Sequence, residues 1–325
     1  MSGKAHLLNR EHQKNNFTTA APLHHVSLLL AGGDGRRLQA FTKEVSGTPI
    51  PKQYCRLLHG SSLLEATLFR TSFFSQSEKI YVIVNRSHLE LAGDQLSMIP
   101  DRNILIQPLN RDTGPGLIFS LFQIEQLYSD AIVAVFPTDH YVSNDRAFIA
   151  HVLRAAEIIS SIPEKIAILG IAPDRPEPGY GYILPAGTLG TAHGVYRVEA
   201  FMEKPDPARA DHIIAKGGLW NTFVMVFRLS RMIELLKIYV PDEFKEMAAV
   251  RDRPDKAEKI YASLVSWNLS RHFLSLIPEH LIALEISDVD WSDWGTRESI
   301  ERTYQALNII PFWNLPDALP DQVAS

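Results

Sequence analysis

Glycines and cations lie together near the start of the chain in a pattern suited to binding phosphate. The run Leu28–Leu38 (LLLAGGDGRRL) leads from an apolar segment into three glycines and two arginines, and Pro51-Lys52-Gln53 follows. Glycine lets backbone N–H groups approach a ligand closely and accepts positive φ. Arginine supplies a planar, permanently charged guanidinium that matches phosphate oxygens. A strand, a glycine turn and clustered cations together predict a polyphosphate site.

Two common phosphate-binding motifs do not fit this run. A dinucleotide fingerprint requires a third glycine where the chain has Leu38. A Walker A loop requires a Lys-Ser or Lys-Thr pair, and none follows Gly35. An ordinary turn between a strand and a helix, with exposed arginines, is the alternative that this motif alone leaves open.

Further polar motifs follow two later apolar runs. Gln107–Gly116 (QPLNRDTGPG) follows an expected strand and opens an expected helix, with Thr113 as its N-cap. The free N–H groups there suit a nucleobase edge or a phosphate, and a simple helix cap is the alternative. In Phe136–His140 (FPTDH), Asp139 stands where a carboxylate would hold Mg²⁺ beside substrate phosphates, or would only cap the next helix.

Two motifs in the second half carry charge next to large apolar residues. Glu203 and Lys204 are adjacent at the end of an expected strand, so we expect them to face opposite sides. Their targets would then differ, one a sugar hydroxyl and the other a phosphate, unless they form a solvated pair. Asp293 lies between two tryptophans. It could be a second carboxylate that holds the metal, or it could cap an expected helix over Thr296–Leu307.

The first half alternates short β-branched runs with segments of helical periodicity. The expected strands are His25–Leu30, Ile80–Val84, Ile104–Gln107, Ala131–Phe136 and Lys165–Ile171. The expected helices are Ser62–Phe74, Ser87–Ser97, Pro115–Tyr128 and Asn144–Ser160. This alternation predicts an α/β fold, a Rossmann-like mixed and mostly parallel sheet with helices on both faces. Ligands of such sheets bind beyond the carboxyl ends of the strands.

The pattern becomes less regular after about Pro173, which indicates a mixed or antiparallel extension of the sheet. The expected strands there are Gly181–Leu184, Val195–Met202, Leu219–Phe227 and Leu281–Glu285. The expected helices are Arg231–Tyr239, Pro241–Val250 and Lys256–Leu264.

The bulk composition narrows the class of protein. A net charge of −5 over 325 residues argues against nucleic-acid binding. Cys55 is the one cysteine, which fits a reducing compartment, and no apolar run approaches the ~20 residues of a membrane span. We therefore expect a cytoplasmic protein without membrane contact, and homo-oligomer formation is left open. The expected divisions are a disordered extension (1–24), one catalytic domain (25–308) and a tail (309–325).

Taken in order, these segments resemble the sugar-phosphate nucleotidyltransferases, specifically the mannose-1-phosphate guanylyltransferase branch. The shared motifs are L-A-G-G-x-G-x-R-L, P-K-Q, P-x-D-H, G-Y-G-Y-I, F-x-E-K-P and W-x-D-x-G, matched from about Val26 to Ile300. The resemblance implies the nucleotide-diphospho-sugar transferase type of fold and a need for Mg²⁺. It also implies transfer of a nucleoside monophosphate from an NTP, here GTP, to a sugar 1-phosphate, here mannose 1-phosphate, with release of pyrophosphate.

The resemblance also implies a role for each matching residue. Arg37 would bind the triphosphate, Lys52 would neutralise charge at the reacting phosphate, and Asp139 and Asp293 would hold the metal. The nucleotide contacts would come from Leu30, Ala31, Gly32, Gly33, Gly35, Asn110, Thr113, Pro137 and Asp139. The sugar-phosphate contacts would come from Gly181, Glu203, Lys204 and Asn221.

The chain departs from the family pattern at a few positions. Arg36 stands at a usually small or polar position, Asp112 replaces an asparagine, and Phe223 stands where a glycine is expected. The segment Phe41–Ile50 reads as a lengthened loop. These departures leave the nucleobase and the sugar open. They also leave two alternatives, a nucleotidyltransferase for a different phosphorylated sugar and a non-catalytic nucleotide-sugar-binding regulatory protein.

Overall fold

A nine-stranded mixed sheet forms the centre of the molecule. The structure is a computed structural model that describes residues 23–58, 60–190 and 193–314. The strand order is β3-β2-β1-β4-β9-β6-β10-β8-β7, and β5 and β11 form a separate two-stranded ribbon. The strands are β1 (His24–Leu30), β2 (Ile80–Asn85), β3 (Ile104–Gln107), β4 (Ala131–Pro137), β5 (Tyr141–Val142), β6 (Ile166–Ile171), β7 (Gly181–Thr188), β8 (Val195–Glu203), β9 (Leu219–Arg228), β10 (Leu281–Ile286) and β11 (Trp291–Ser292).

The first four strands are parallel, and β1, β2 and β4 are largely buried on both faces, whereas β3 lies at the edge and leaves Ile106 exposed. β1 lies between β2 and β4, and β3 extends the sheet beyond β2. Along β4, Val133 and Val135 join the core on one face, while Ile132 and Ala134 join the core on the other. Both faces therefore demand apolar residues, which explains why these strands appear in the sequence as continuous apolar runs. The carboxyl ends of the parallel strands meet at one edge, as expected.

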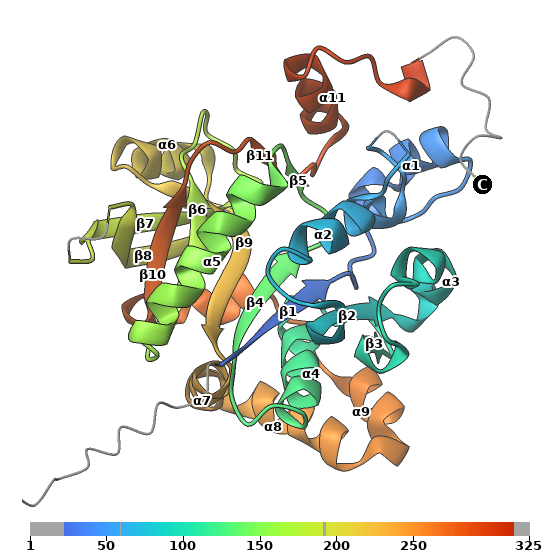
Figure 1. Cartoon of the computed structure of the whole chain (residues 1–325), viewed down its shortest axis with the longest axis vertical. Coiled ribbons are helices and arrows are strands. Elements are labelled where there is room, and N and C mark those ends of the chain that lie inside the picture. Colours follow the sequence, from blue (N-terminus) through green and yellow to red (C-terminus); the bar gives the residue numbers. More distant parts are fainter. Residues whose placement is uncertain (1–22, 59, 191–192, 315–325) are drawn as a thin grey trace, which may run out of the picture.

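The second half of the sheet is mixed, as the sequence predicts. β9 runs antiparallel to both β4 and β6, and β10 is parallel to β6. β8 and β7 continue the sheet in antiparallel pairs, and β7 also pairs with β9. The pairings of β9, β6, β10, β8 and β7 thus close a ring, which lies beside the parallel half in Figure 1.

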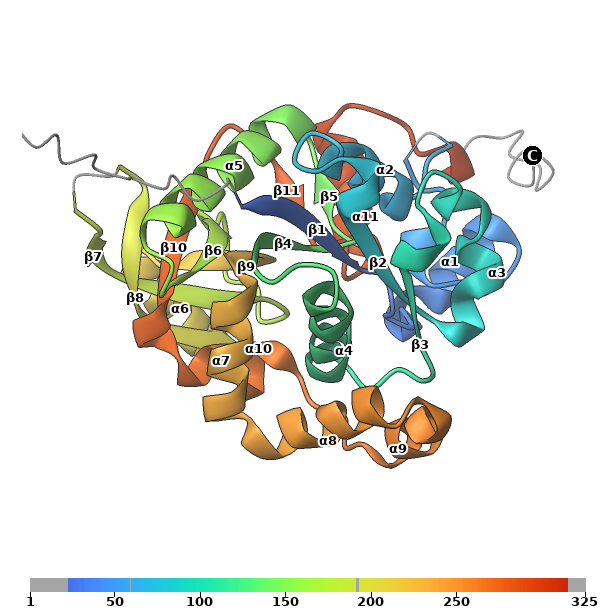
Figure 2. The same cartoon turned by 60° about the horizontal axis from the view of Figure 1, so that its bottom comes forward.

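Helices cover both faces of the sheet, which confirms the expected class. α4 (Thr113–Glu125) and α7 (Leu229–Tyr239) contact one face, and α5 (Asp145–Ser161) contacts the other, an arrangement visible in Figure 2. The remaining helices are α1 (Gln39–Ser46), α2 (Leu63–Thr71), α3 (Leu89–Ala92), α6 (Pro207–Ala215), α8 (Pro241–Asp252), α9 (Ala257–Ser263), α10 (Leu269–His272) and α11 (Arg297–Ala306). Within the described residues no helix is long and apolar enough to cross a bilayer.

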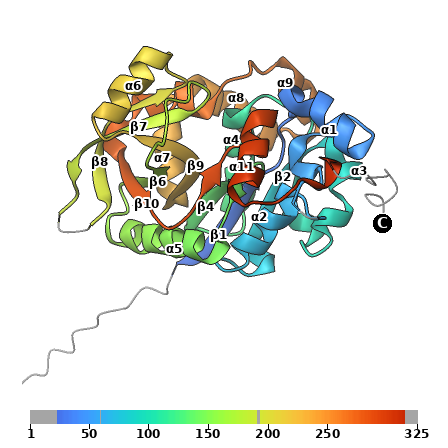
Figure 3. The same cartoon turned by 90° about the horizontal axis from the view of Figure 1, so that it is seen from above.

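The prediction of a loop over Phe41–Ile50 is wrong for its first part, where α1 forms. Phe41 and Val45 stand one helical turn apart, and both are buried in a small cluster with Trp294. α11 lies beside α1 (Figure 3), and Arg297 on α11 pairs with Glu44 on α1 at 2.8 Å. The helix α11, near the end of the described residues, thereby holds α1, near their beginning, in place. The predicted extension falls almost wholly on residues 1–22, which lie outside the described residues, as does most of the predicted tail.

Candidate active site

A cleft of about 520 Å³ opens at the carboxyl ends of β1, β3 and β4. Its walls come from the loops after those strands, the end of β8, the middle of β9 and the segment around β11. With one exception, Ala31, the structure brings all the predicted site residues together in this cleft. They are Leu30, Gly32, Gly33, Gly35, Arg37, Lys52, Asn110, Thr113, Pro137, Asp139, Gly181, Glu203, Lys204, Asn221 and Asp293.

Hydrogen bonds from two amide side chains hold the glycine loop in place. Gln53 Nε2 donates to the carbonyl of Gly33 at 2.6 Å, and Asn85 Nδ2 donates to the carbonyl of Gly32 at 2.6 Å. Gly35 has φ 60°, and a side chain there would meet the backbone of Pro51 at 3.0 Å. Glycine is therefore required at this position for two reasons, its backbone conformation and the close approach of the Pro-Lys-Gln segment.

Ala31 supports the loop from behind and does not reach the cleft. Its N–H donates to the carbonyl of Ile83 at 2.9 Å, and its own carbonyl accepts from the Tyr54 hydroxyl at 2.6 Å. The side chain is fully buried. The sequence prediction placed it with its neighbours because they are adjacent in the motif, whereas this residue still belongs to the core at the end of β1.

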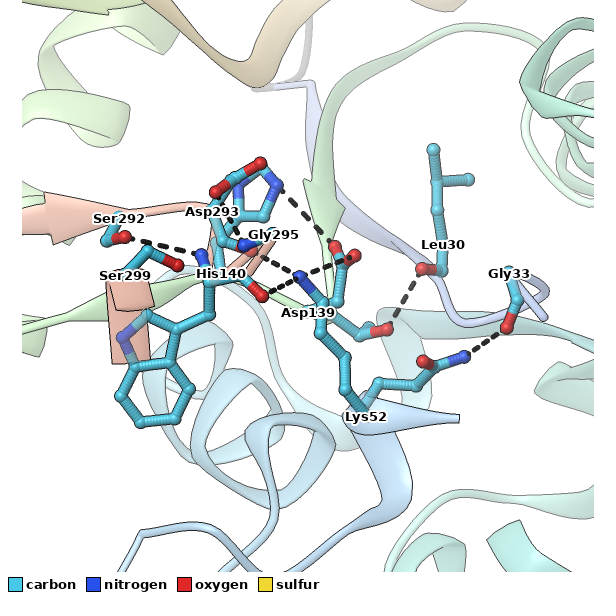
Figure 4. A network of polar contacts seen from close by, with 12 residues as sticks. Leu30, Gly33, Lys52, Asp139, His140, Ser292, Asp293, Gly295 and Ser299 are labelled. Carbon is cyan, nitrogen blue, oxygen red and sulfur yellow. Dashed lines mark hydrogen bonds and ion pairs between the residues drawn. The ribbon is translucent and has the colours of Figure 1, made fainter. Parts of the chain in front are cut away.

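Lys52 lies at the centre of the cleft and is 5% exposed. Its ammonium group donates to the carbonyl of Trp294 at 3.0 Å and to that of Asp293, and it lies 3.3 Å from Asp139 Oδ2. Figure 4 shows the side chain reaching between these partners. A buried ammonium is tolerated only where such partners replace water. One cation thus links the Pro-Lys-Gln segment, the end of β4 and the segment after β11.

The charges around Asp139 are arranged so that its carboxylate stays ionised. Burial alone would raise the pKa of this carboxyl, but the charges of Lys52 and His140 outweigh burial and hold it below its usual value. Burial lowers the pKa of His140, and the Lys52 charge adds to that shift. His140 Nε2 lies 3.5 Å from Asp139 Oδ1, and its ring packs edge-on against Trp291. His140 also lines the cleft, although it was not predicted as a site residue.

Five of the residues that line the cleft carry a carboxylate, and Asp139 and Asp293 are the two that were predicted to hold a metal. Among the described residues, no group of three or more His, Cys, Asp or Glu side chains is placed to hold a metal. Asp139 and Asp293 both line the cleft, as two separate carboxylates and not as part of such a group. Mg²⁺ is bound in this way, through one or two carboxylates together with substrate phosphates. One oxygen of Asp293 also accepts the N–H of Gly295 at 2.7 Å, which fixes the carboxylate.

Glu203 and Lys204 lie at the other end of the cleft, and they face the same side. Their predicted opposition is wrong, because the alternation of faces holds only within a strand and Lys204 lies just beyond β8 with φ 51°. Lys204 Nζ is 3.6 Å from Glu203 Oε1. Burial raises the pKa of the Glu203 carboxyl, and the Lys204 charge offsets this only in part. A side chain at Gly181 would meet the Glu203 carboxylate at 2.8 Å, so glycine leaves it room.

The start of α4 is capped more fully than predicted. The N–H of Thr113 donates to Asp112 Oδ1 at 2.6 Å, and the N–H of Gly114 donates to the carbonyl of Trp267 at 3.2 Å. Asp112, not Thr113, is the N-cap, and these two N–H groups are already used within the protein. The segment 264–268 closes this end, and Ser266 lines the cleft. Sequence reasoning missed it because it contains no motif and lies far away in the chain.

Strained backbone gathers around the cleft. Six non-glycine residues among those described have positive φ, and three of them line the cleft, namely Asp112, Lys204 and Phe223. Such conformations cost about 1–3 kcal/mol each and concentrate where a ligand is bound. This is a sign of function that does not depend on any motif.

Comparisons with known proteins agree with this geometry. A family model described as "Nucleotidyl transferase" matches residues 26–308. A mannose-1-phosphate guanylyltransferase of Klebsiella pneumoniae is 32% identical over 286 residues, which cover 83% of this chain and 58% of that protein. The alginate biosynthesis protein AlgA of Pseudomonas aeruginosa is 31% identical over 222 residues, covering 67% and 44% respectively. The chain thus spans about half the length of these curated relatives.

A solved structure shares the fold. The crystal structure described as a mannose-1-phosphate geranyltransferase from Thermus thermophilus superposes with a TM-score of 0.76 at 28% sequence identity. The match covers 87% of this chain and 79% of that one.

Proposed function

The chain belongs to the nucleotidyl transferase family, and we propose that it transfers a nucleoside monophosphate from GTP to mannose 1-phosphate, giving the nucleotide sugar and pyrophosphate. The observation that carries this proposal is the ion pair in the cleft between the buried ammonium group of Lys52 and the partly exposed carboxylate of Asp139. The glycine loop lies on one side of the pair, and Glu203 and Lys204 lie on the other. The relatives that carry the guanylyltransferase name support the choice of GTP and mannose 1-phosphate.

The reaction is an in-line displacement at the α-phosphorus of the nucleotide. An oxygen of the sugar phosphate forms the new P–O bond, and the bond to the β-phosphate breaks with its electron pair leaving on pyrophosphate. The attacking phosphate is already ionised at neutral pH because its second pKa is about 6. A general base is therefore unnecessary, and the protein contributes positioning and positive charge.

Three cationic side chains and two carboxylates would share the positioning of the substrates and the neutralisation of their charge. Arg37 is exposed at the mouth of the cleft and has no ion-pair partner among the described residues, so it is available to the triphosphate. Lys52 is held beside the centre of the reaction, and Lys204 is placed to bind the sugar phosphate. Asp139 and Asp293 would hold Mg²⁺, which supplies neutralisation of phosphate charge when it is bound.

The test is pyrophosphate release from the four NTPs, each paired with a panel of sugar 1-phosphates in the presence of Mg²⁺. We expect the largest kcat/KM for GTP with mannose 1-phosphate. A maximum with another pair would retain the reaction and replace the substrates. No release with any pair, combined with binding of a nucleotide sugar measured by calorimetry, would instead favour a regulatory protein of the same fold.

A further inference from the structure

β9 carries a bulge where it passes the cleft. Gly170 of β6 pairs with Asn221, and Ile168 pairs with Met225. One residue separates these pairs on β6, whereas Thr222, Phe223 and Val224 separate them on β9. A bulge bends its strand and redirects a side chain, and bulges are frequent beside active sites.

Side chains within the bulge fix its conformation. The Thr222 hydroxyl donates to the carbonyl of Leu169 at 2.8 Å and accepts the N–H of Val224 at 3.3 Å. Asn221 Oδ1 accepts the N–H of Phe223 at 3.1 Å. Together these bonds hold Phe223 at φ 63°, in the left-handed region. For a residue with a Cβ atom this conformation costs about 1–2 kcal/mol.

Within the bulge, polar side chains are buried and an aromatic side chain is partly exposed, which is the opposite of the distribution that favours folding. The polar residues Asn221 and Thr222 are 6% and 0% exposed, and Val224 is 2% exposed. Phe223 alone is only partly buried, and it lines the cleft. The aromatic residue is therefore strained, and although it packs against the core cluster, part of it stays exposed in the cleft. Its position is explained by what it presents to the cleft.

The wall that contains Phe223 also contains the groups suited to a sugar phosphate. Asn221, Gly181 and Glu203 lie together, since a side chain at Gly181 would meet Asn221 Cβ at 3.4 Å and Glu203 Oε2 at 2.8 Å. Phe223 offers no hydrogen bond to a substrate. A polar substituent pressed against it would lose water without gaining a partner, and a large one would lack room.

We propose that Phe223 is a specificity-determining residue for the acceptor. It restricts the cleft to sugar 1-phosphates that turn a small, apolar edge toward this wall, and it excludes those with a bulky polar substituent there. This inference rests on the proposed function, because it assigns the acceptor to this end of the cleft.

The test compares two acceptors in the wild type and in Phe223→Gly, which removes the ring and suits the positive φ. The acceptors are mannose 1-phosphate and N-acetylglucosamine 1-phosphate, which bears a bulky acetamido group. We expect the ratio of kcat/KM for the larger to the smaller acceptor to rise at least about tenfold in Phe223→Gly, within the range typical of a pocket that gains room. Phe223→Leu, which keeps apolar bulk, should retain the wild-type preference.

Asn308→Gly is the matched control. Asn308 also has a positive φ, of 54°, but it lies after α11 and does not line the cleft. This variant relieves similar backbone strain, so a gain in thermal stability is expected without any change in the acceptor ratio. An equal change of ratio in Asn308→Gly would show that strain, and not the ring, sets the preference, and would overturn the inference.

Calorimetric binding of each acceptor phosphate, without nucleotide, separates this inference from the proposed function. A shift of binding preference in Phe223→Gly supports it even if no pyrophosphate is released. Wild-type turnover with a ratio that stays within about threefold in Phe223→Gly overturns it and leaves the proposed function intact. If neither acceptor binds either protein and no pyrophosphate is released, both proposals fail. Circular dichroism checks folding, and Phe223→Ala replaces the glycine variant if that variant is unfolded.

Discussion

At the scale of single residues, Lys52 carries most of what the cleft requires. Its ammonium group pairs with Asp139 and donates to two carbonyls of the segment after β11. Replacement by methionine keeps an unbranched side chain, one atom shorter, and removes the ammonium group with its charge. We expect kcat to fall about 10²-fold or more, as for the loss of one preorganised charge contact. Two buried carbonyls would also lose their donor, so the free energy of unfolding should fall by about 1–3 kcal/mol.

Lys43→Met is the control for this change. Lys43 lies exposed on α1, so its replacement should leave both kcat and the urea midpoint unchanged. The measurements are pyrophosphate release and urea unfolding for both variants. If Lys52→Met kept more than about a third of wild-type kcat, Lys52 would be assigned to structure alone and not to charge at the reacting phosphate.

Several residues of the cleft could be predicted because their motifs follow a strand directly, and others because the motif itself is distinctive. Gly32, Lys52 and Asp139 stand in short motifs whose chemistry is visible in the sequence. Their partners could not be predicted, since the carbonyls that bind Lys52 belong to a segment more than two hundred residues later. Likewise, the left-handed conformation of Lys204, which turns it to the side of Glu203, has no signature in the residue type.

At the scale of elements, the contact between α4 and the segment 264–268 closes one end of the cleft. A Cβ at Gly114 would lie 2.4 Å from the ring of Trp267, so Gly114→Ala requires the segment to move. We expect a loss of about 1–3 kcal/mol in the free energy of unfolding through overpacking. This outweighs the helix preference of alanine over glycine, which is about 1 kcal/mol.

Gly116→Ala on the same helix provides the comparison. Its Cβ would meet Gln107 Oε1 at 3.3 Å and Ile83 Cδ1 at 3.6 Å, which are much looser contacts than the one at Gly114. Urea unfolding should therefore place the midpoint of Gly114→Ala below that of the wild type and clearly below that of Gly116→Ala. Equal midpoints for the two variants would contradict a tight contact between Trp267 and α4.

A helix or strand could be predicted where its buried residues leave a recognisable hydrophobic pattern in the sequence. The parallel strands are apolar on both faces, and α5 shows its core face at helical spacing. The ribbon of β5 and β11 has two residues in each strand, which is too short for any periodicity. α1 was missed because only Phe41 and Val45 mark its buried side, and their partners lie in α11 and around Trp294.

At the scale of the whole molecule, the sheet order brings distant parts of the chain to one cleft. β9 separates β4 from β6, and β10 pairs with β6 although more than a hundred residues lie between them. Strand periodicity specifies which face is buried but not which strand is the neighbour. The sequence therefore predicted a mixed sheet with a site at its carboxyl edge, whereas the order of the strands required the structure.

Histidines that are buried or partly buried in different parts of the fold predict how stability depends on pH. The pKa values of His25, His88, His140 and His280 are all lowered, chiefly by burial. The unfolded chain therefore binds more protons than the folded chain between the usual value of about 6.5 and the lower folded values. Stability from this source is complete above about pH 6.5 and is lost as the pH falls through that window.

We expect the free energy of unfolding, measured with urea, to stay level from pH 7.5 to about pH 6.5 and to fall from there to pH 5. His88→Gln should make this dependence shallower, because His88 is 7% exposed and its Nδ1 has no partner among the described residues. The carboxylate of Asp34, 3.7 Å from Nε2, only partly compensates for a proton there. His212→Gln, on the exposed side of α6, should leave the slope unchanged. Stability that rises toward pH 5, or equal slopes for wild type and His88→Gln, would contradict this account, because a buried neutral imidazole must lose stability on protonation.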